Sequence, residues 1–180
     1  MKRYFISLAA VFCLFCVFTG CGSKTAPSVT TTLHNGEITC DVPEDWALDE
    51  LGIRINENQL ICIGSFPSTE LSNAFQEDYK KFAQLFVQNR QFGISPDYEI
   101  TGDVGHQDIN GYSAVTFPSF HSSGDDEVNS LEAVFYIESK EYFIWINLDS
   151  KSGTPISDEV EKMFYDMVAS AKIDESKLSD

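Results

Sequence analysis

Apolar and polar residues alternate in the first part of the chain, and this alternation predicts β-strands with one buried face. Residues 37–42 alternate after a turn-forming stretch, and Pro43 ends them because proline has no N–H for a strand ladder. The face predicted to be buried carries Ile38, Cys40 and Val42. A second strand is expected at 59–66, where a continuous apolar run predicts burial on both faces. Ile53 and Ile55 indicate a short strand just before it.

More strands are predicted in the second half of the chain. Stretches 98–104 and 110–117 flank a polar loop, and 131–139 and 141–149 form a hairpin. In this hairpin both faces of the predicted sheet are apolar. In the first strand, Leu131, Ala133, Phe135 and Ile137 share one face and Val134 and Tyr136 the other. In the second strand, Tyr142, Ile144, Ile146 and Leu148 lie opposite Phe143 and Trp145. Both faces of the sheet therefore need a cover.

Two stretches have the period of an amphipathic helix. The first covers about 70–91, with Ser68 or Thr69 as N-cap, and the second starts with Thr154 as N-cap and Pro155 at the first helical position. Their apolar stripes are Leu71, Phe75, Tyr79, Phe82 and Phe86, and Ile156, Val160, Met163, Phe164, Met167 and Ala171. Burial against the sheet explains the aromatic stripe better than a ligand box. We expect an α+β fold, a largely antiparallel sheet sandwiched by helices (an α/β/α sandwich).

The first twenty residues have the pattern of an export signal. Lys2 and Arg3 precede an apolar stretch over 4–18, which is shorter than the roughly 20 apolar residues that a membrane-spanning helix needs. The quartet Phe18-Thr19-Gly20-Cys21 resembles the lipobox of bacterial lipoproteins. The resemblance implies cleavage before Cys21 and a diacylglycerol on its thiol, a stable anchor because it carries two acyl chains. The alternative is an ordinary secretory signal followed by a coincidental cysteine.

Removal of 1–20 leaves a chain of a length that suits one domain. Residues 21–32 are expected to form the lipidated cysteine and a flexible tether, 33–173 a single domain and 174–180 a polar tail. Alternatively, 29–33 already form an edge strand and the tether is shorter. The net charge of −16 becomes −18 when the signal takes two cations with it. This charge argues against nucleic acid as a partner and against adhesion to anionic lipid, so the acyl chains are the expected membrane contact.

Five cysteines divide into three groups. Cys13 and Cys16 leave with the signal, and Cys21 is the expected lipidation site. Cys40 and Cys62 remain for the domain, where a disulfide and two buried free thiols are equally consistent with the sequence. If the strands that carry them pair, the two sulfurs could meet.

Candidate chemistry elsewhere in the sequence is sparse. His106 and its acidic neighbours match no metal-binding spacing, and His34 and His121 fall in predicted loops. The run 125–127 of three carboxylates could bind calcium, although a solvated loop explains it better. No nucleophile elbow or phosphate-binding glycine loop is present in the sequence. We therefore expect no enzyme activity, no cofactor and no metal.

The order of elements, with the corner 42–46 (Val-Pro-Glu-Asp-Trp) and the turn 109–112 (Ile-Asn-Gly-Tyr), resembles the PsbP-like domain over about 37–173. In this domain helices sandwich a largely antiparallel sheet. Its superfamily includes a cofactor of a nuclear-transport GTPase and many bacterial lipoproteins, and known members mainly bind or organise other proteins. The resemblance transfers no functional residue.

These observations favour a lipoprotein anchored through Cys21 at the extracytoplasmic face of the cell membrane. We expect a non-enzymatic protein-binding or scaffolding module whose partner is another envelope protein. The first alternative is an accessory lipoprotein that binds a small ligand or cation for a transporter or sensor. A cell-wall hydrolase is the weaker alternative.

Overall fold

The computed structural model describes residues 27–50 and 52–178, which form two antiparallel sheets. The larger sheet has the order β3 (Ala47–Asp49), β4 (Gly52–Arg54), β5 (Gln59–Pro67), β10 (Tyr142–Ser150), β9 (Asp126–Ile137), β8 (Tyr112–Ser123) and β6 (Glu99–Ile100). Strand β7 (Gly105–Ile109) also pairs with β8. The smaller sheet contains β1 (Ser28–Leu33), β2 (Ile38–Pro43) and β11 (Lys172–Ile173).

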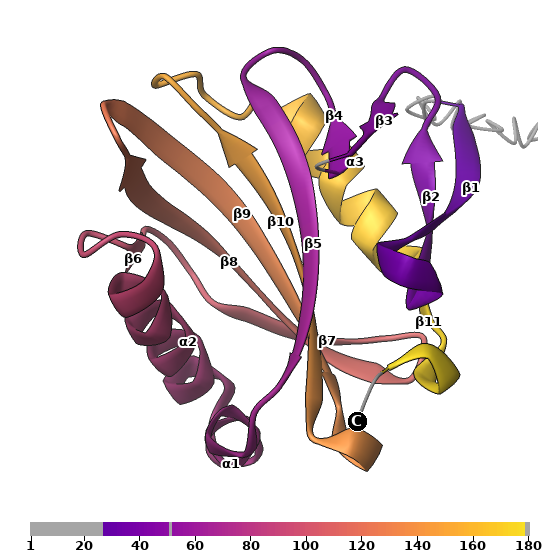
Figure 1. Cartoon of the computed structure of the whole chain (residues 1–180), viewed down its shortest axis with the longest axis vertical. Coiled ribbons are helices and arrows are strands. Elements are labelled where there is room, and N and C mark those ends of the chain that lie inside the picture. Colours follow the sequence, from indigo (N-terminus) through magenta and orange to yellow (C-terminus); the bar gives the residue numbers. More distant parts are fainter. Residues whose placement is uncertain (1–26, 51, 179–180) are drawn as a thin grey trace, which may run out of the picture.

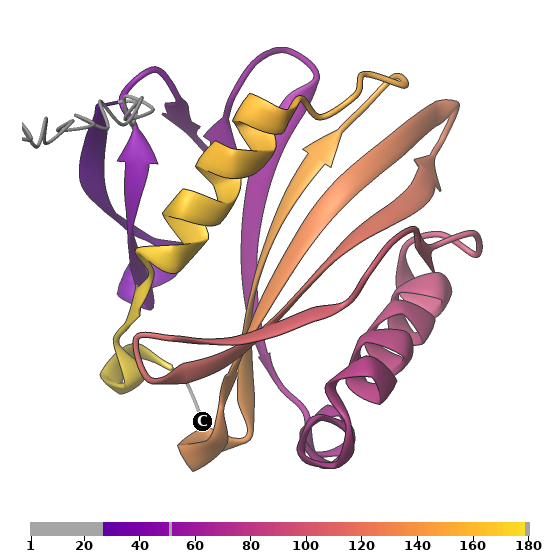
Figure 2. The ribbon, with the colours of Figure 1, turned by 180° about the vertical axis from the view of Figure 1, so that it is seen from behind.

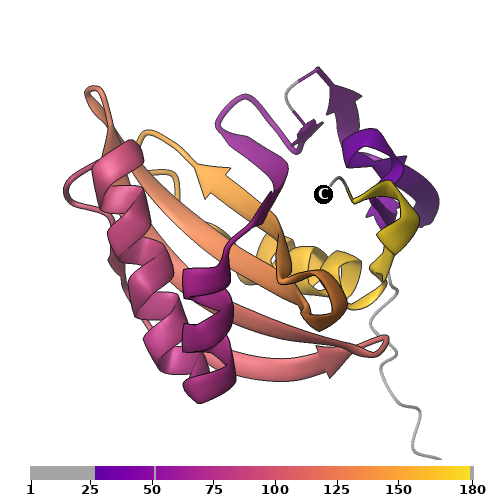
Figure 3. The same ribbon diagram turned by 60° about the horizontal axis from the view of Figure 1, so that its bottom comes forward.

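Helices cover both faces of the larger sheet, as the sequence predicts. Helices α1 (Thr69–Glu77) and α2 (Tyr79–Gly93) lie on one face, and α3 (Asp158–Ala169) lies on the other together with the smaller sheet (Figures 1 and 2). The view in Figure 3 shows the same separation of α1 and α2 from α3 by the sheet. The predicted α+β sandwich is therefore confirmed.

Two apolar layers form the core, one on each side of the sheet. The first layer joins β9 and β10 to α3 and β2, and it contains Ile38, Cys40, Phe135, Ile144, Phe164 and Met167. The second joins the opposite face of the same strands to α1 and α2, and it contains Leu71, Phe82, Phe86, Phe117, Val134 and Phe143. The predicted alternation in β9 and β10 is confirmed, because successive residues of each strand enter different layers.

Strand β5 is buried less completely than its apolar run predicts. Ile61 is fully buried in the first layer, whereas Leu60, Cys62 and Ile63 are only half-buried. The reason is its place in the sheet, because β5 lies near one side, where only the short strands β4 and β3 follow it and cover little of its surface.

The predicted long helix is two helices, α1 and α2, separated by one residue. Asp78 has extended φ and ψ angles of −162° and 122°, and its carboxylate accepts a hydrogen bond from Lys80 N at 2.7 Å. Aspartate is a preferred N-cap residue, so Asp78 starts α2 where a continuous helix was expected. The apolar stripe continues across the break, since the rings of Phe75 and Phe82 lie 5.0 Å apart. The predicted cap Ser68 is confirmed by its bond from Leu71 N.

The stretch predicted as a polar loop between two strands is itself a strand, β7. It forms a hairpin with β8 through Asn110 and Gly111, which have positive φ angles of 51° and 89°. Such angles suit a two-residue hairpin turn, and Asn-Gly is a preferred sequence for it. Most of β7 is exposed, so its residues lack the apolar alternation that would reveal a strand.

The described residues begin with a strand of the smaller sheet and end shortly after another of its strands. Strand β1 starts at Ser28 and pairs along its length with β2, which confirms the alternative of an edge strand at 29–33 and a shorter tether. At the other end β11 pairs with β2, and the supposed polar tail forms a 3-10 turn at Glu175–Lys177 that buries Leu178. Helix α3 also starts later than predicted, because Ser157 and not Thr154 accepts the capping bond from Val160 N.

Candidate functional site

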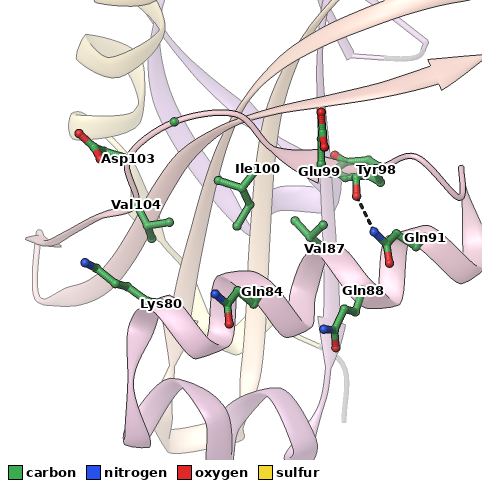
Figure 4. Close-up of a pocket in the computed structure, with 11 residues that line it drawn as sticks. Lys80, Gln84, Val87, Gln88, Gln91, Tyr98, Glu99, Ile100, Asp103 and Val104 are labelled. Carbon is green, nitrogen blue, oxygen red and sulfur yellow. Dashed lines mark hydrogen bonds between the residues drawn. The ribbon is translucent and has the colours of Figure 1, made fainter.

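The C-terminal half of α2 is flanked by grooves on both sides, and we treat it as the candidate site. The first groove runs between α2 and β6 and has a volume of about 480 Å³ (Figure 4). Val87, Ile100 and Val104 point toward one another and form its apolar floor. Its rim is polar, with the three amides Gln84, Gln88 and Gln91 from α2 and the charged side chains Lys80, Glu99 and Asp103.

Tyr98 connects this groove to a buried polar network. Its backbone oxygen accepts a hydrogen bond from Gln91 Nε2 at 2.8 Å, which fixes the edge of β6 to α2 (Figure 4). Its hydroxyl points into the protein and donates to Glu132. The edge of the groove is therefore held by a side chain that reaches the centre of the sheet.

Glu132 is the centre of this network and is completely buried. Its Oε1 accepts hydrogen bonds from Tyr98 and from the Ser119 hydroxyl at 2.9 Å, and its Oε2 accepts one from Trp145 Nε1 at 2.5 Å. Burial raises the pKa of the Glu132 carboxyl, against the lowering effect of its hydrogen-bond donors. Since donors from the protein occupy both oxygens, this carboxylate organises the sheet and is not exposed to a substrate.

Trp145 in turn holds Arg90 in place. The guanidinium carbon of Arg90 lies 3.6 Å from the centre of the Trp145 ring and 5.0 Å from that of Phe86, which are cation–π distances. Among residues 27–50 and 52–178, Arg90 has no ion-pair partner. A stacked and unpaired guanidinium keeps its N–H donors available for an acceptor.

The second groove lies on the other side of α2, toward β5, and has a volume of about 380 Å³. Phe66, Pro67, Phe86 and Ile94 supply its apolar surface, and Arg90 is the charged residue in its lining. Ile94 is 51% exposed, and Phe92 on the last turn of α2 is 94% exposed. Phe92 lines neither groove, so the end of α2 carries two exposed apolar side chains, of which Ile94 belongs to this groove.

The segment after α2 is fixed by Asp97 and His121. The carboxylate of Asp97 accepts bonds from the hydroxyls of Ser122 and Ser95 and from Ser122 N, and these donors lower its pKa to about 2. His121 stacks on Tyr98 with ring centres 4.7 Å apart. Burial lowers the pKa of His121, and its Nδ1 has no hydrogen-bond partner among the described residues.

The structure places the three histidines far from any common site. His34 lies in a 3-10 turn, as its loop prediction implied, and its Nε2 is 3.0 Å from the Ser65 hydroxyl. His106 and His121 were predicted in loops but lie on β7 and β8, and His106 stacks on Tyr79 at 5.1 Å. The acidic run 125–127 spans a turn and the start of β9. In the described part of the chain, no three His, Cys, Asp or Glu residues are grouped to hold a metal.

Cys40 and Cys62 are free thiols on different sheets, so the alternative with a disulfide is not what the structure contains. Cys40 belongs to the layer around α3. Ile61 enters that same layer, so the adjacent Cys62 points to the opposite face of the larger sheet. Burial raises the pKa of the Cys40 thiol to about 12. The expected lipidation site, Cys21, lies outside the described residues.

Sequence reasoning missed the residues of the candidate site, although some signals were present. Phe92 lies outside the apolar stripe of its helix, and Glu132 is the one acid within the apolar stretch 131–137. An apolar residue on a polar face and an acid on a buried face are both departures from binary patterning that favour a special role.

No helix within the described ranges is long and apolar enough to span a membrane.

Comparison with known proteins gives a fold and no family. No family model matches the chain, and no curated protein matches its sequence. The Saccharomyces cerevisiae Ran-binding protein Mog1p aligns with a TM-score of 0.54 and 13% identity, over 86% of this chain and all of Mog1p. LpqN of Mycobacterium tuberculosis, described as involved in cell envelope biogenesis, aligns with a TM-score of 0.51 and 15% identity, over 81% of this chain and 91% of LpqN.

A cyanobacterial PsbP from Synechocystis aligns with a TM-score of 0.48 and 16% identity, over 84% of this chain and 95% of PsbP. At these identities the alignments with Mog1p and LpqN concern the fold alone. The α+β sandwich described above is therefore the fold that the chain shares with Mog1p and LpqN.

Proposed function

We propose that this chain is a membrane-anchored extracytoplasmic lipoprotein that binds another envelope protein and catalyses no reaction. The observation that carries the proposal is the exposure of Phe92 at 94%, on a helix that has a groove on each side. Aromatic residues are enriched among the side chains that dominate protein interfaces. A partner that covers Phe92 would remove a large apolar side chain from water.

The chemistry around the grooves supports binding more than catalysis. Glu132 is the most deeply buried carboxylate near the site, and its two oxygens already accept three hydrogen bonds. A catalytic carboxylate needs a free oxygen within hydrogen-bond reach of its substrate. The groove rim instead carries amide side chains, which can donate to and accept from a partner backbone.

The known functions of the structural neighbours agree with this proposal. Mog1p is a Ran-binding protein, and LpqN is described as involved in cell envelope biogenesis. A lipid on Cys21 would leave six residues, 22–27, before β1 begins at Ser28, a span of roughly 25 Å at most. The partner would then be a membrane protein or another protein close to the membrane surface.

In-cell photo-cross-linking tests the proposal directly. A photoreactive phenylalanine analogue replaces Phe92 in the full-length chain, and the same analogue at Leu48 is the matched control, because Leu48 is also exposed (56%) but lies on β3. We expect discrete cross-linked products that contain one envelope protein from position 92 and none from position 48. Equal or absent cross-linking at the two positions would contradict the proposal.

A further inference from the structure

We propose that the groove between α2 and β5 binds a short apolar segment of a partner protein that carries a carboxylate, and that Arg90 pairs with this carboxylate. The inference rests on the proposed protein-binding function and names the chemistry of the partner. It follows from the absence of an ion-pair partner for Arg90 in the described residues, from the apolar lining of the groove and from the net negative charge of the chain.

Stacking fixes the guanidinium of Arg90 in position, and no carboxylate pairs with it in the described part of the chain. Its guanidinium is stacked on Trp145 at 3.6 Å, and Trp145 is fixed by the hydrogen bond from its indole to Glu132. In a chain with 28 acidic residues, Arg90 still has no ion-pair partner within the described part. Glu132 itself is occupied by other donors. Because guanidinium and carboxylate match in a planar, two-bond geometry, a carboxylate is the acceptor that fits best.

The groove beside Arg90 accepts apolar side chains. Phe66, Phe86, Pro67 and Ile94 line it, and its volume of about 380 Å³ can hold a few apolar side chains. Ile94, an apolar residue of this lining, is 51% exposed. The lining includes no aspartate or glutamate, so no local charge repels an acidic ligand.

Charge also separates this groove from the rest of the surface. The chain has a net charge of −16, and a basic partner would find many acidic surfaces to bind. The α2–β5 groove is different, because its lining carries a single positive charge and no negative one. A partner with an acidic group beside apolar residues would therefore be directed to this groove and kept away from the other faces.

The test uses the full-length chain in lipid nanodiscs and a phage library of random short peptides. Selected peptides are synthesised and measured on wild type, Arg90→Gln and Arg90→Lys. We expect the selected peptides to carry Asp or Glu within a few residues of Phe, Leu or Ile. An acidic peptide should bind wild type about tenfold more tightly than its counterpart with glutamine in place of glutamate, and Arg90→Gln should remove this difference.

Two further variants sharpen the result. Arg90→Lys keeps the charge but loses the planar fork, so it should restore only part of the preference for the acidic peptide. Ile94→Ser should weaken binding of both peptides with little effect on folding, because Ile94 lines the groove and is 51% exposed. This variant keeps the inference testable if Arg90→Gln fails to fold, which the thermal unfolding curve would show.

Other occupants of the groove are outcomes that overturn the inference. Selected peptides without acidic residues, bound equally by wild type and Arg90→Gln, would overturn it but leave the protein-binding function standing. Tighter binding of sodium laurate than of any peptide would assign the groove to a lipid. Self-association that Ile94→Ser abolishes would assign the groove to a second copy of this chain. Failure of cross-linking at Phe92 would instead count against the proposed function itself.

Discussion

The indole nitrogen of Trp145 donates a hydrogen bond to Oε2 of Glu132 at 2.5 Å, in the centre of the larger sheet. The bond joins a completely buried carboxylate to the aromatic ring on which Arg90 stacks. The geometry of the α2–β5 groove therefore depends on a residue that no ligand touches.

We expect Trp145→Phe to lower the free energy of unfolding by about 1–3 kcal/mol, because it leaves a buried carboxyl oxygen of Glu132 without its hydrogen-bond donor. Ser119→Ala is the control, since Oε1 of Glu132 still accepts from Tyr98, and it should cost only about 1 kcal/mol. Urea unfolding followed by circular dichroism measures both. A Trp145→Phe variant as stable as wild type would show that the network does not hold the sheet.

Acid should destabilise the protein in part through Asp97. Hydrogen bonds from Ser122 and Ser95 lower its pKa from 3.8 to about 2 in the folded protein. The deprotonated form is thus favoured by folding, so its contribution is complete above pH 3.8 and is lost as the pH falls toward 2. Between about pH 5 and about pH 2, the melting temperature of Asp97→Asn should fall less steeply than that of wild type. Parallel curves would contradict this role of Asp97.

Cys40 and Cys62 should both be free thiols in the purified protein, so a reducing agent should release no additional thiol from the domain. With a thiol reagent near neutral pH, the half-buried Cys62 should react faster than the buried Cys40, whose pKa is raised to about 12. Both should react fully in denaturant. Peptide mapping of unreduced protein is the check, and a peptide that links the two cysteines would refute the prediction.

Phe92 should be dispensable for folding. Phe92→Ser should change the free energy of unfolding by less than about 0.5 kcal/mol, as for most surface substitutions. Phe86→Ala, on the same helix but only 2% exposed, should cost about 3–5 kcal/mol. Thermal or urea unfolding compares the two variants. A large loss of stability in Phe92→Ser would mean that Phe92 packs within the domain.

Cys21→Ser should release the protein from the membrane or block its processing, because the thiol that receives the lipid is missing. Fractionation of cells that express wild type and variant measures the membrane-bound share. Retention of the variant in the membrane at the level of wild type would refute lipidation at Cys21.

Much of the fold could be predicted because buried strands and helices carry strong periodic patterns. In β9 and β10 each face packs against its own apolar layer, so the assignment of residues to faces was correct. Elements with little burial were missed. Strand β7 is mostly exposed, and Asp78 interrupts a helical stripe whose apolar residues remain in phase. In such places local hydrogen bonding decides the structure, and the apolar pattern says little about it.

The candidate site was hidden for a different reason. Arg90, Trp145 and Glu132 come from α2, β10 and β9, and only the strand register and the packing of α2 bring them together. The exposure of Phe92 likewise depends on where α2 ends. A single sequence carries the residue types but not this long-range geometry.

The pairing of β11 with β2 has a consequence for the order of folding. Lys172 lies opposite Thr39, so the smaller sheet joins residues from the two ends of the domain. A chain that emerges N-terminus first can form the β1–β2 hairpin early, but the hairpin stays without its third strand until the last segment arrives. Closing so long a loop carries an entropy cost that local packing does not offset until α3 has formed. Completion of the smaller sheet therefore waits until Lys172 and Ile173 are free to pair with β2.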